Sequence, residues 1–255
     1  MVTLQEGKNE LVLSPDLQIT TQKGVQSFLV LRINDALNTT LQVHVAKDSQ
    51  LTLFCLNQSS ELELNEVYTL ASDAKLELAY GDFSVGKATR NVTVNLEGQG
   101  SEITLNSAAL VSKESVISYR FNHKNRHTAG QMNNFAVLSE GGSMTLKAIG
   151  HIEANGANSE THQTTRVLNL KGSKKATVFP YLIIDNNDVQ ASHAESTGQM
   201  DDDHLYYLQS RGLSADQAIR LLVKGYLSSV TDSIQDEALK ALILDEIDQK
   251  VDAIC

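Results

Sequence analysis

Short segments in which apolar and polar residues alternate recur along the chain as far as about residue 190. The clearest lie at residues 41–45, 51–53, 62–64, 76–78, 92–96, 103–105 and 144–146. Alternation with a period of two places the apolar side chains on one face of a β-strand and Thr, Glu or Gln on the other. The segments recur roughly every 10 to 13 residues, a spacing typical of a β-sandwich, a barrel or a solenoid.

Two features favour the solenoid among these three. A hydrophobic-Thr-Leu unit recurs at residues 51–53, 68–70, 103–105 and 144–146, as expected when similar coils stack like residues on one another. Tight-turn signals between clean strands are sparse, with only Asn155-Gly156 as a candidate hairpin. The periodicity by itself leaves the sandwich and the barrel open. With 2 Pro, 5% aromatic residues and no Trp, the core is expected to be aliphatic.

The pattern changes near residue 200, where helical signals begin. Asp201, Asp202 and Asp203 suit a helix N-terminus, and Gly212 is a stop signal. Ser214 and Gln217 match a capping box that opens a second helix. A third segment opens at residues 236–237, with apolar residues at 239, 242, 243, 247, 251 and 254. We therefore predict two domains, a β core over residues 1–195 and a helical domain over residues 196–255.

Composition and charge limit the classes of partner and indicate the cellular compartment. The charge of 21 − 31 = −10 disfavours a nucleic-acid surface, while 41% hydrophobic residues are enough to bury a core. The longest apolar runs, at residues 28–31 and 218–223, are far too short to cross a bilayer, so we expect no membrane segment. Two cysteines and an N-terminus without a basic segment and an apolar run predict a cytoplasmic protein.

The sequence motifs of common enzymes are absent. Neither GxxxxGK[ST] nor GxGxxG occurs, so any ATP must be bound by another chain. GxSxG, HExxH and CxxC are missing too, which disfavours hydrolase triads and preformed zinc sites. We therefore predict that the chain is not an enzyme.

The remaining candidates for chemistry are histidines and cysteines. His123, Arg126 and His127 lie within five residues, but no Cys or carboxylate completes a metal site there, so a solvated loop or coil corner is favoured. The polar stretch 160–166, which contains His162, is interpreted as a hydrogen-bonded surface ladder. Cys55 is predicted to be a buried structural cysteine. The terminal Cys255 is expected to be mobile and a poor fixed ligand.

From Gly150 onward the chain resembles the SufB/SufD family, the scaffold subunits of the Suf system for iron–sulfur cluster assembly. Several separate blocks in the same order carry the resemblance, which makes it specific. They lie at residues 150–152, 161–168, 179–183, 187–194, 198–202, 205–212 and 218–226. The blocks cover about a third of the chain, and the β-repetitive part before them looks like the family's solenoid without a sharp motif.

The resemblance implies a mainly β fold, with a right-handed parallel β-helix core and a C-terminal α-helical domain. In this family, SufB and SufD pair through their β-helices, and each helical domain docks the ABC-type ATPase SufC. The resemblance places the docking surface on the helices that carry Leu205, Tyr206, Tyr207, Arg211 and Leu213. The alternative is that the Leu-Tyr-Tyr-Leu run packs against the β body. No intrinsic cofactor is expected, only a transient iron–sulfur cluster at the SufB–SufD interface.

Departures from the family pattern favour a SufD-like subunit. SufD-like members tend to carry Lys-Cys-Ser-His-Gly where this chain has Gln190-Ala-Ser-His-Ala194, so His193 is kept and the thiol is replaced by Ala191. His193, together with Glu195 and residues of the partner, would then have to ligate the cluster. Family members are commonly longer, with an N-terminal helical region, so we expect a core-plus-C-terminal piece or a short form.

Two other classes of function remain as alternatives. One is a β-solenoid that binds or acts on polysaccharide, although Trp platforms and an export signal are missing from this sequence. The other is a structural homodimer, in which two copies pair through their β-helix edges.

Overall fold

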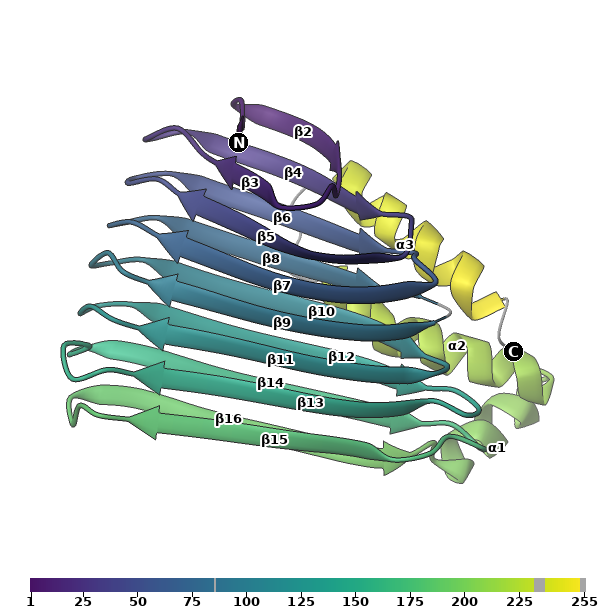
Figure 1. Ribbon diagram of the computed structural model, residues 1–255. Coiled ribbons are helices and arrows are strands. Elements are labelled where there is room, and N and C mark those ends of the chain that lie inside the picture. Colours follow the sequence, from purple (N-terminus) through teal and green to yellow (C-terminus); the bar gives the residue numbers. More distant parts are fainter. Residues whose placement is uncertain (85, 232–236, 253–255) are drawn as a thin grey trace.

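The computed structural model describes residues 1–84, 86–231 and 237–252. Its strands stack in parallel coils that form an elongated β-helix, and helices lie along one side of the stack (Figure 1). Each strand pairs in parallel with the strand two positions later in the chain, for example β10 with β12 and β11 with β13. This pairing alternates between two sheets and generates a solenoid, which confirms the predicted fold class.

The odd-numbered strands form the first sheet, called sheet A here, and the even-numbered strands form sheet B. Sheet A contains β1 (Val2–Thr3), β3 (Leu17–Thr20), β5 (Leu37–Val45), β7 (Glu61–Leu70), β9 (Lys87–Leu96), β11 (Glu114–His123), β13 (Ser143–Ile152) and β15 (Ala176–Ile184). Sheet B contains β2 (Gly7–Val12), β4 (Gln26–Ile33), β6 (Gln50–Asn57), β8 (Lys75–Asp82), β10 (Glu102–Val111), β12 (Ala129–Leu138), β14 (Ser159–Asn169) and β16 (Val189–Gln199).

The main core lies between the two sheets and consists largely of stacked columns of aliphatic side chains, but four buried aromatic residues, Tyr68, Tyr80, Tyr119 and Phe121, interrupt the expected aliphatic core. One column runs through Leu29, Leu53, Leu78, Leu105 and Met132, which are successive register partners on sheet B and are all fully buried. Parallel pairing in constant register places like residues above one another, so each coil buries the apolar face of the next. The hydrophobic-Thr-Leu units at residues 51–53 and 103–105 occupy equivalent positions on sheet B, two coils apart. The units at residues 68–70 and 144–146 lie on sheet A at different register positions, so the prediction that the unit marks like positions of stacked coils holds only in part.

Three α-helices follow the last strand: α1 (Asp202–Ser210), α2 (Ala215–Leu227) and α3 (Glu237–Asp252), with the short 3-10 helix η1 (Ser228–Thr231) between α2 and α3. Asp201 caps α1 through a bond from the Asp203 backbone N–H to its side chain. Ser214 and Gln217 form both bonds of the predicted capping box at α2. Asp236, Ile254 and Cys255, which belong to the predicted third helical segment and tail, lie outside the described residues.

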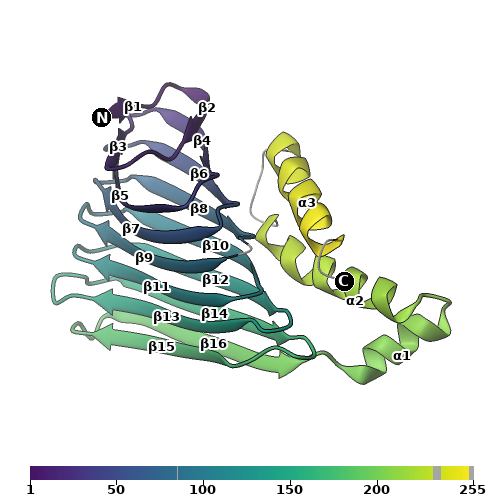
Figure 2. The ribbon, with the colours of Figure 1, turned by 45° about the vertical axis from the view of Figure 1, so that its right-hand side comes forward.

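Helices α2 and α3, with η1 between them, pack on the outward face of sheet B, whereas α1 projects from the body (Figure 2). There Val223, Leu227, Ile243 and Ile247 join a second core with the outward side chains of sheet B. The sheet B members of this core are Val30, Phe54, Leu56, Ala79, Ala108, Leu110 and Val137. Sheet B is therefore buried on both faces where the helices cover it, and this is why its strands contain consecutive apolar residues. Asn155-Gly156 joins no hairpin, because every strand pairing in the described residues is parallel.

Candidate functional site

The two sheets end together at the last coil, formed by β15 and β16. We call this coil the open end. Both strands are edge strands, because β15 is the last member of sheet A and β16 the last of sheet B. None of the residues of β15 or β16 is buried, whereas every second residue of β14 is buried from Ser159 to Val167. An edge strand offers unpaired backbone N–H and C=O groups, so the open end is suited to pairing with another chain.

The register shows which side chains of β16 face the solenoid axis. The buried residues Gln163 and Thr165 of β14 pair with His193 and Glu195 of β16. His193 therefore continues the column that contains Leu105 and Met132 in earlier coils and that turns polar at Gln163. The predicted ligand His193 and the carboxylate Glu195 share the inward face of the last coil and are both exposed to solvent.

The open end does not by itself complete a metal site. In the part of the chain that the structure describes, no three His, Cys, Asp or Glu side chains gather at a distance suited to one metal ion. His151 and His162 lie on the last coils but face outward. His151 Nε2 lies 2.9 Å from Asp185 Oδ2, and His162 Nδ1 lies 2.7 Å from Ser192 Oγ. An ion bound by His193 would need further ligands from outside this chain.

Helix α1 forms a second exposed surface. None of its residues is buried, and the rings of Tyr206 and Tyr207 are 75% and 56% exposed. The Arg211 guanidinium lies 5.3 Å from the centroid of the Tyr207 ring, while Leu205 and Leu213 are half-buried. The five predicted partner-binding residues thus lie on or next to one helix that projects from the body. Exposed Tyr and Arg side chains are enriched in protein–protein interfaces.

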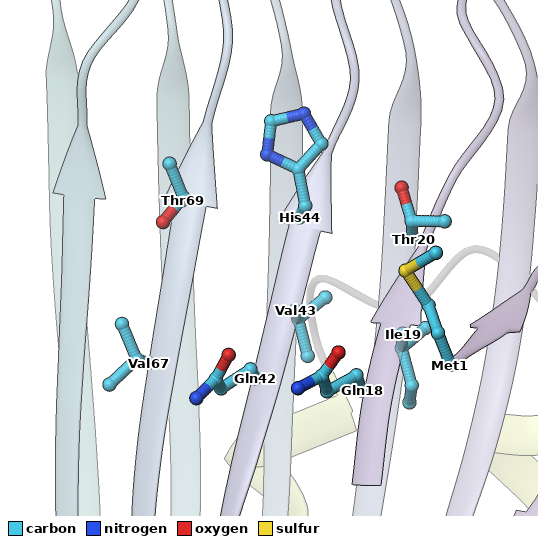
Figure 3. A pocket seen from close by; sticks show the side chains of 9 residues that line it. All are labelled: Met1, Gln18, Ile19, Thr20, Gln42, Val43, His44, Val67 and Thr69. Carbon is cyan, nitrogen blue, oxygen red and sulfur yellow. The ribbon is translucent and has the colours of Figure 1, made fainter.

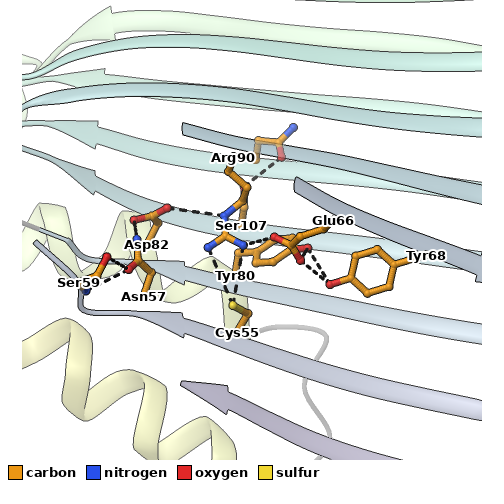
Figure 4. A network of polar contacts seen from close by, with 10 residues as sticks. Cys55, Asn57, Ser59, Glu66, Tyr68, Tyr80, Asp82, Arg90 and Ser107 are labelled. Carbon is orange, nitrogen blue, oxygen red and sulfur yellow. Dashed lines mark hydrogen bonds and ion pairs between the residues drawn. The ribbon is translucent and has the colours of Figure 1, made fainter. Parts of the chain in front are cut away.

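A buried ionic network lies inside the solenoid between β6 and β9, and the sequence-based predictions did not include it (Figure 4). The Arg90 guanidinium forms an ion pair with Glu66 and lies 4.4 Å from the centroid of the Tyr80 ring. The hydroxyls of Tyr68 and Tyr80 donate to Glu66 Oε2 at 2.5 and 2.9 Å. Arg90 and Glu66 are 0% and 1% exposed. The sequence did contain a signal for this network, because Glu66 and Arg90 stand where the apolar/polar alternation of their strands points inward.

Asp82 and Cys55 complete this network. The Asn57 amide donates to Asp82 Oδ1 at 2.9 Å, and Asp82 Oδ2 lies 3.8 Å from Arg90 Nε. Cys55 is fully buried beside the guanidinium, which confirms the prediction of a buried cysteine. Burial raises the pKa of the Cys55 thiol to about 12, so the thiol stays protonated and unreactive. The network ties the two sheets together and offers no reactive group to solvent.

The structure corrects two sequence interpretations. His123 does not lie in a solvated loop: it is fully buried at the end of β11, and burial lowers its pKa to about 4. Its Nδ1 lies 2.9 Å from Thr128 Oγ1. The stretch 160–166 is not only a surface ladder, because Thr161, Gln163 and Thr165 point into the solenoid. The alternation of β14 sends every second polar side chain inward, which composition alone does not reveal.

A shallow hollow of about 280 Å³ lies on the outward face of sheet A near the N-terminus (Figure 3). Figure 3 shows Gln18 and Gln42 side by side on neighbouring strands, with His44 between Thr20 and Thr69. Most of the lining side chains are regularly spaced outward residues of sheet A, whereas Ile19 and Val43 belong to the core between the sheets. No acidic or basic cluster is found among the described residues that line the hollow. We therefore place the candidate site at the open end and on α1. No helix within the described ranges has the length and apolar character needed to span a membrane.

In comparison with known proteins, most of the chain matches one family. The family model described as "SUF system FeS cluster assembly, SufBD core domain" matches residues 3–226. The chain is 30% identical over 181 residues to the iron–sulfur cluster assembly protein SufD of Bacillus subtilis, covering 70% of this chain and 41% of that protein. It is 24% identical over 163 residues to SufD of Escherichia coli, covering 63% of this chain and 38% of that protein.

The chain is also similar to the SufB protein of Bacillus subtilis, with 23% identity over 195 residues. This alignment covers 72% of this chain and 42% of that protein. The chain therefore spans about two fifths of the length of these curated relatives. The match includes the solenoid, the open end, α1 and α2 up to Tyr226, and it leaves α3 outside.

Proposed function

Because this chain belongs to the SufBD family of the SUF system for iron–sulfur cluster assembly, we propose that it is a SufD-like, non-catalytic subunit of a SufBCD-type scaffold complex. In this proposal it pairs with a SufB-type subunit through its β-helix and docks a SufC-type ATPase through its C-terminal helices. The higher identity to SufD than to SufB of the same organism, 30% against 23%, supports the SufD-like assignment. The complex would reside in the cytoplasm.

The open end is the observation that carries the proposal. The last coil combines two edge strands with an inward face that no further coil covers. On sheet A this face presents Val178, Pro180 and Leu182, the register partners of buried residues of β13. On sheet B it presents His193 and Glu195. A second β-helix placed end to end would extend both sheets and shield the apolar half from water.

His193 would then lie at the junction between the two subunits, and iron and sulfide are the cargo assembled there. An imidazole is a suitable ligand for iron, and the missing ligands would come from the partner subunit and from sulfide. The chain's own contribution is to hold this imidazole on a rigid strand and to exclude water from the apolar side of the junction. No step requires a nucleophile or a general base from this chain.

Helix α1 supports the ATPase contact. The sequence contains no phosphate-binding loop, so energy from ATP would have to come from another subunit. Tyr206, Tyr207 and Arg211 form an exposed aromatic and basic surface on a helix that follows directly from β16. Movement of an ATPase bound at α1 would therefore be transmitted to the strand that carries His193.

Calorimetric titration of the full chain with a SufC-type ATPase tests this function. We expect saturable binding, and we expect the variant Tyr206→Ala/Tyr207→Ala to bind at least about tenfold more weakly, since exposed interface tyrosines are frequent hot spots. Tyr181→Ala is the control, because that exposed tyrosine lies on sheet A rather than on α1. Absence of binding to the wild-type chain, or equal binding by the α1 variant, would refute the docking surface.

A structural homodimer remains as a second candidate, because the open end could also pair with its own copy. This alternative predicts a dimer of this chain that a SufB-type subunit does not dissociate. The polysaccharide-binding alternative loses support, because the family model that matches the chain describes iron–sulfur cluster assembly.

A further inference from the structure

A cleft of about 620 Å³ lies where the helices leave the solenoid, and we call it the junction cleft. One wall is formed by the solenoid turns that follow β12 and β14, and the other wall by the N-terminal ends of α1 and α2. Figure 2 shows α1 leaving the stack next to the end of β16. Clefts of roughly 300–1,000 Å³ where two structural units meet are frequent binding sites for small ligands.

The floor of the junction cleft is apolar. Leu170, Met200 and Ile219 line the cleft and pack against the second core on sheet B, and Leu205 of α1 is a further apolar lining residue. All four side chains are only partly buried. No aromatic residue is found among the described residues that line the cleft, so it offers no surface on which a nucleobase could stack. The floor suits aliphatic groups of a ligand.

The two walls carry opposite charges. Lys171 and Lys174 stand on the solenoid wall, where Glu140 reduces their excess to one positive charge. Asp202 and Asp216 stand on the helix wall. None of these five side chains forms an ion pair with another residue in the described part of the chain. A ligand in the cleft therefore meets free charges of both signs.

Asn169 adds a polar group that lacks a partner. Its Nδ2 donates to the backbone carbonyl of Gly198 at 3.2 Å, and this bond fixes the orientation of the amide. Asn169 lines the cleft, and its Oδ1 is buried without a hydrogen-bond partner among the described residues. An unpaired buried acceptor is costly, so a ligand that supplies an N–H group is favoured.

These features select one class of ligand. A phosphate-bearing ligand would bring its negative charge to a cleft in which three carboxylates outnumber two lysines. A ligand with a carboxylate at one end and an ammonium group at the other is complementary to both walls. An extended tripeptide places these groups about 10 Å apart, and its amide N–H groups are donors for a buried acceptor.

We propose that the junction cleft binds a short peptide with free termini. The carboxylate of the peptide lies at Lys171 and Lys174, and an aliphatic side chain rests on the apolar floor. The ammonium group lies at Asp202 and Asp216. A bound peptide bridges the last coils and the first two helices, so it stiffens the connection between the open end and α1.

The test is an NMR titration of the full chain with the tripeptide Ala-Leu-Ala, followed through the backbone amide signals at about 0.15 M salt. We expect saturable shifts at residues 169–174 and 199–202, which line the cleft or adjoin its lining residues. The N-acetylated and the C-amidated forms of the same tripeptide each lack one charge. Each should bind about fivefold more weakly than the free tripeptide.

The lysine wall is tested by Lys171→Ala/Lys174→Ala. This variant should bind the free tripeptide about fivefold more weakly and the C-amidated form as the wild-type chain does, because that form has no carboxylate for the lysines to contact. Lys175→Ala is the control, since Lys175 is an exposed lysine of the same turn that does not line the cleft. It should bind all forms as the wild-type chain does.

The acidic wall is tested in the same way by Asp202→Asn/Asp216→Asn. This variant should bind the free tripeptide about fivefold more weakly and should not change the affinity for the N-acetylated form. Asp203→Asn removes a neighbouring exposed carboxylate that does not line the cleft, and it should have no effect.

Three results would overturn the inference. The first is an absence of saturable shifts at the cleft. The second is C-amidated tripeptide that binds as tightly as the free form or more tightly, as the net charge of −10 alone would favour for a cation. The third is an equal loss of affinity for both forms in the lysine variant. Tyr206 and Tyr207 do not line the cleft, so Tyr206→Ala/Tyr207→Ala should bind the tripeptide normally, and this proposal and the ATPase docking fail separately.

Discussion

Glu66 and Arg90 form an ion pair in the interior, with both side chains almost completely removed from solvent. Both charges are removed from water, and their desolvation is offset by the ion pair, the two tyrosine hydroxyls and the stacked Tyr80 ring. Removing one partner leaves the other charge buried without compensation, which costs far more than the pair contributes when intact. The network is therefore sensitive to single substitutions.

We predict that Arg90→Met lowers the free energy of unfolding by about 3–5 kcal/mol, because it leaves the Glu66 carboxylate unpaired in the core. Urea denaturation followed by circular dichroism measures the change. Lys75→Met is the control, since the Lys75–Glu102 pair is exposed on both sides and should cost less than about 1 kcal/mol. An Arg90→Met variant as stable as that control would contradict this role for the network.

His123 makes the stability of the chain depend on pH. Burial, together with the neighbouring His151, lowers its pKa from 6.5 to about 4. Above pH 6.5 the imidazole is neutral in both the folded and the unfolded chain. Between pH 6.5 and pH 4 only the unfolded chain takes up the proton, so stability falls as the pH falls.

At about pH 5 this effect should cost about 2 kcal/mol relative to about pH 7. The free energy of unfolding of His123→Gln should fall by about 2 kcal/mol less than that of the wild-type chain between these two pH values. This difference does not depend on how stable the variant is at about pH 7. His44→Gln, at an exposed position, should show the wild-type loss. Urea denaturation at both pH values checks this, and equal losses for His123→Gln and the wild-type chain would contradict it.

At the level of elements, many β-strands were predictable because apolar and polar residues alternate along them, as at residues 92–96 of β9. The capping box of α2 was predictable because Ser214 and Gln217 act within one helical turn. The helices' packing surface was not predicted, although sheet B carries a signal for it. Residues 53–56 are apolar at four consecutive positions because one face meets the core and the other meets the helices.

The candidate site was predictable only in part. His193 and the exposed tyrosines of α1 were predicted from the family resemblance rather than from a pattern in the chain itself. The partners beneath His193 depend on register between strands about 30 residues apart, which no local pattern encodes. The alternation showed that Glu66 and Arg90 stand at inward positions, but their pairing joins two coils, and only the register between the coils reveals it.

Helix α3 lies beyond the matched family domain. Aliphatic contacts in the second core attach it, together with ion pairs to Lys224 of α2 and a hydrogen bond from Gln58 to Glu246. We predict that Ile247→Ala, which removes a side chain that is 1% exposed, lowers the stability of α3 by about 2–5 kcal/mol. Hydrogen exchange should accelerate in α3 and remain unchanged in β10 and β12. Asp245→Ala, at an exposed position of the same helix, should leave exchange unaffected. Equal acceleration in the solenoid would show that α3 and the sheets unfold as one unit.

At the scale of the whole molecule, the two exposed surfaces lie at the C-terminal end of the β-helix, opposite the end whose edge strands are β1 and β2. Columns of apolar side chains fill the interior of the solenoid, and the ionic network around Arg90 links its middle coils. The last coil is left open, and α1 follows it directly. This arrangement suits a subunit whose role is to present one end to a partner and one helix to a second partner.

Light scattering of the chain mixed with a SufB-type subunit and a SufC-type ATPase tests the proposed scaffold role in a single measurement. We expect one complex that contains all three proteins, with a mass equal to their sum in a defined stoichiometry. Elution of this chain at its own mass, or as a dimer of itself in the presence of both partners, would show that it is not a subunit of such a scaffold.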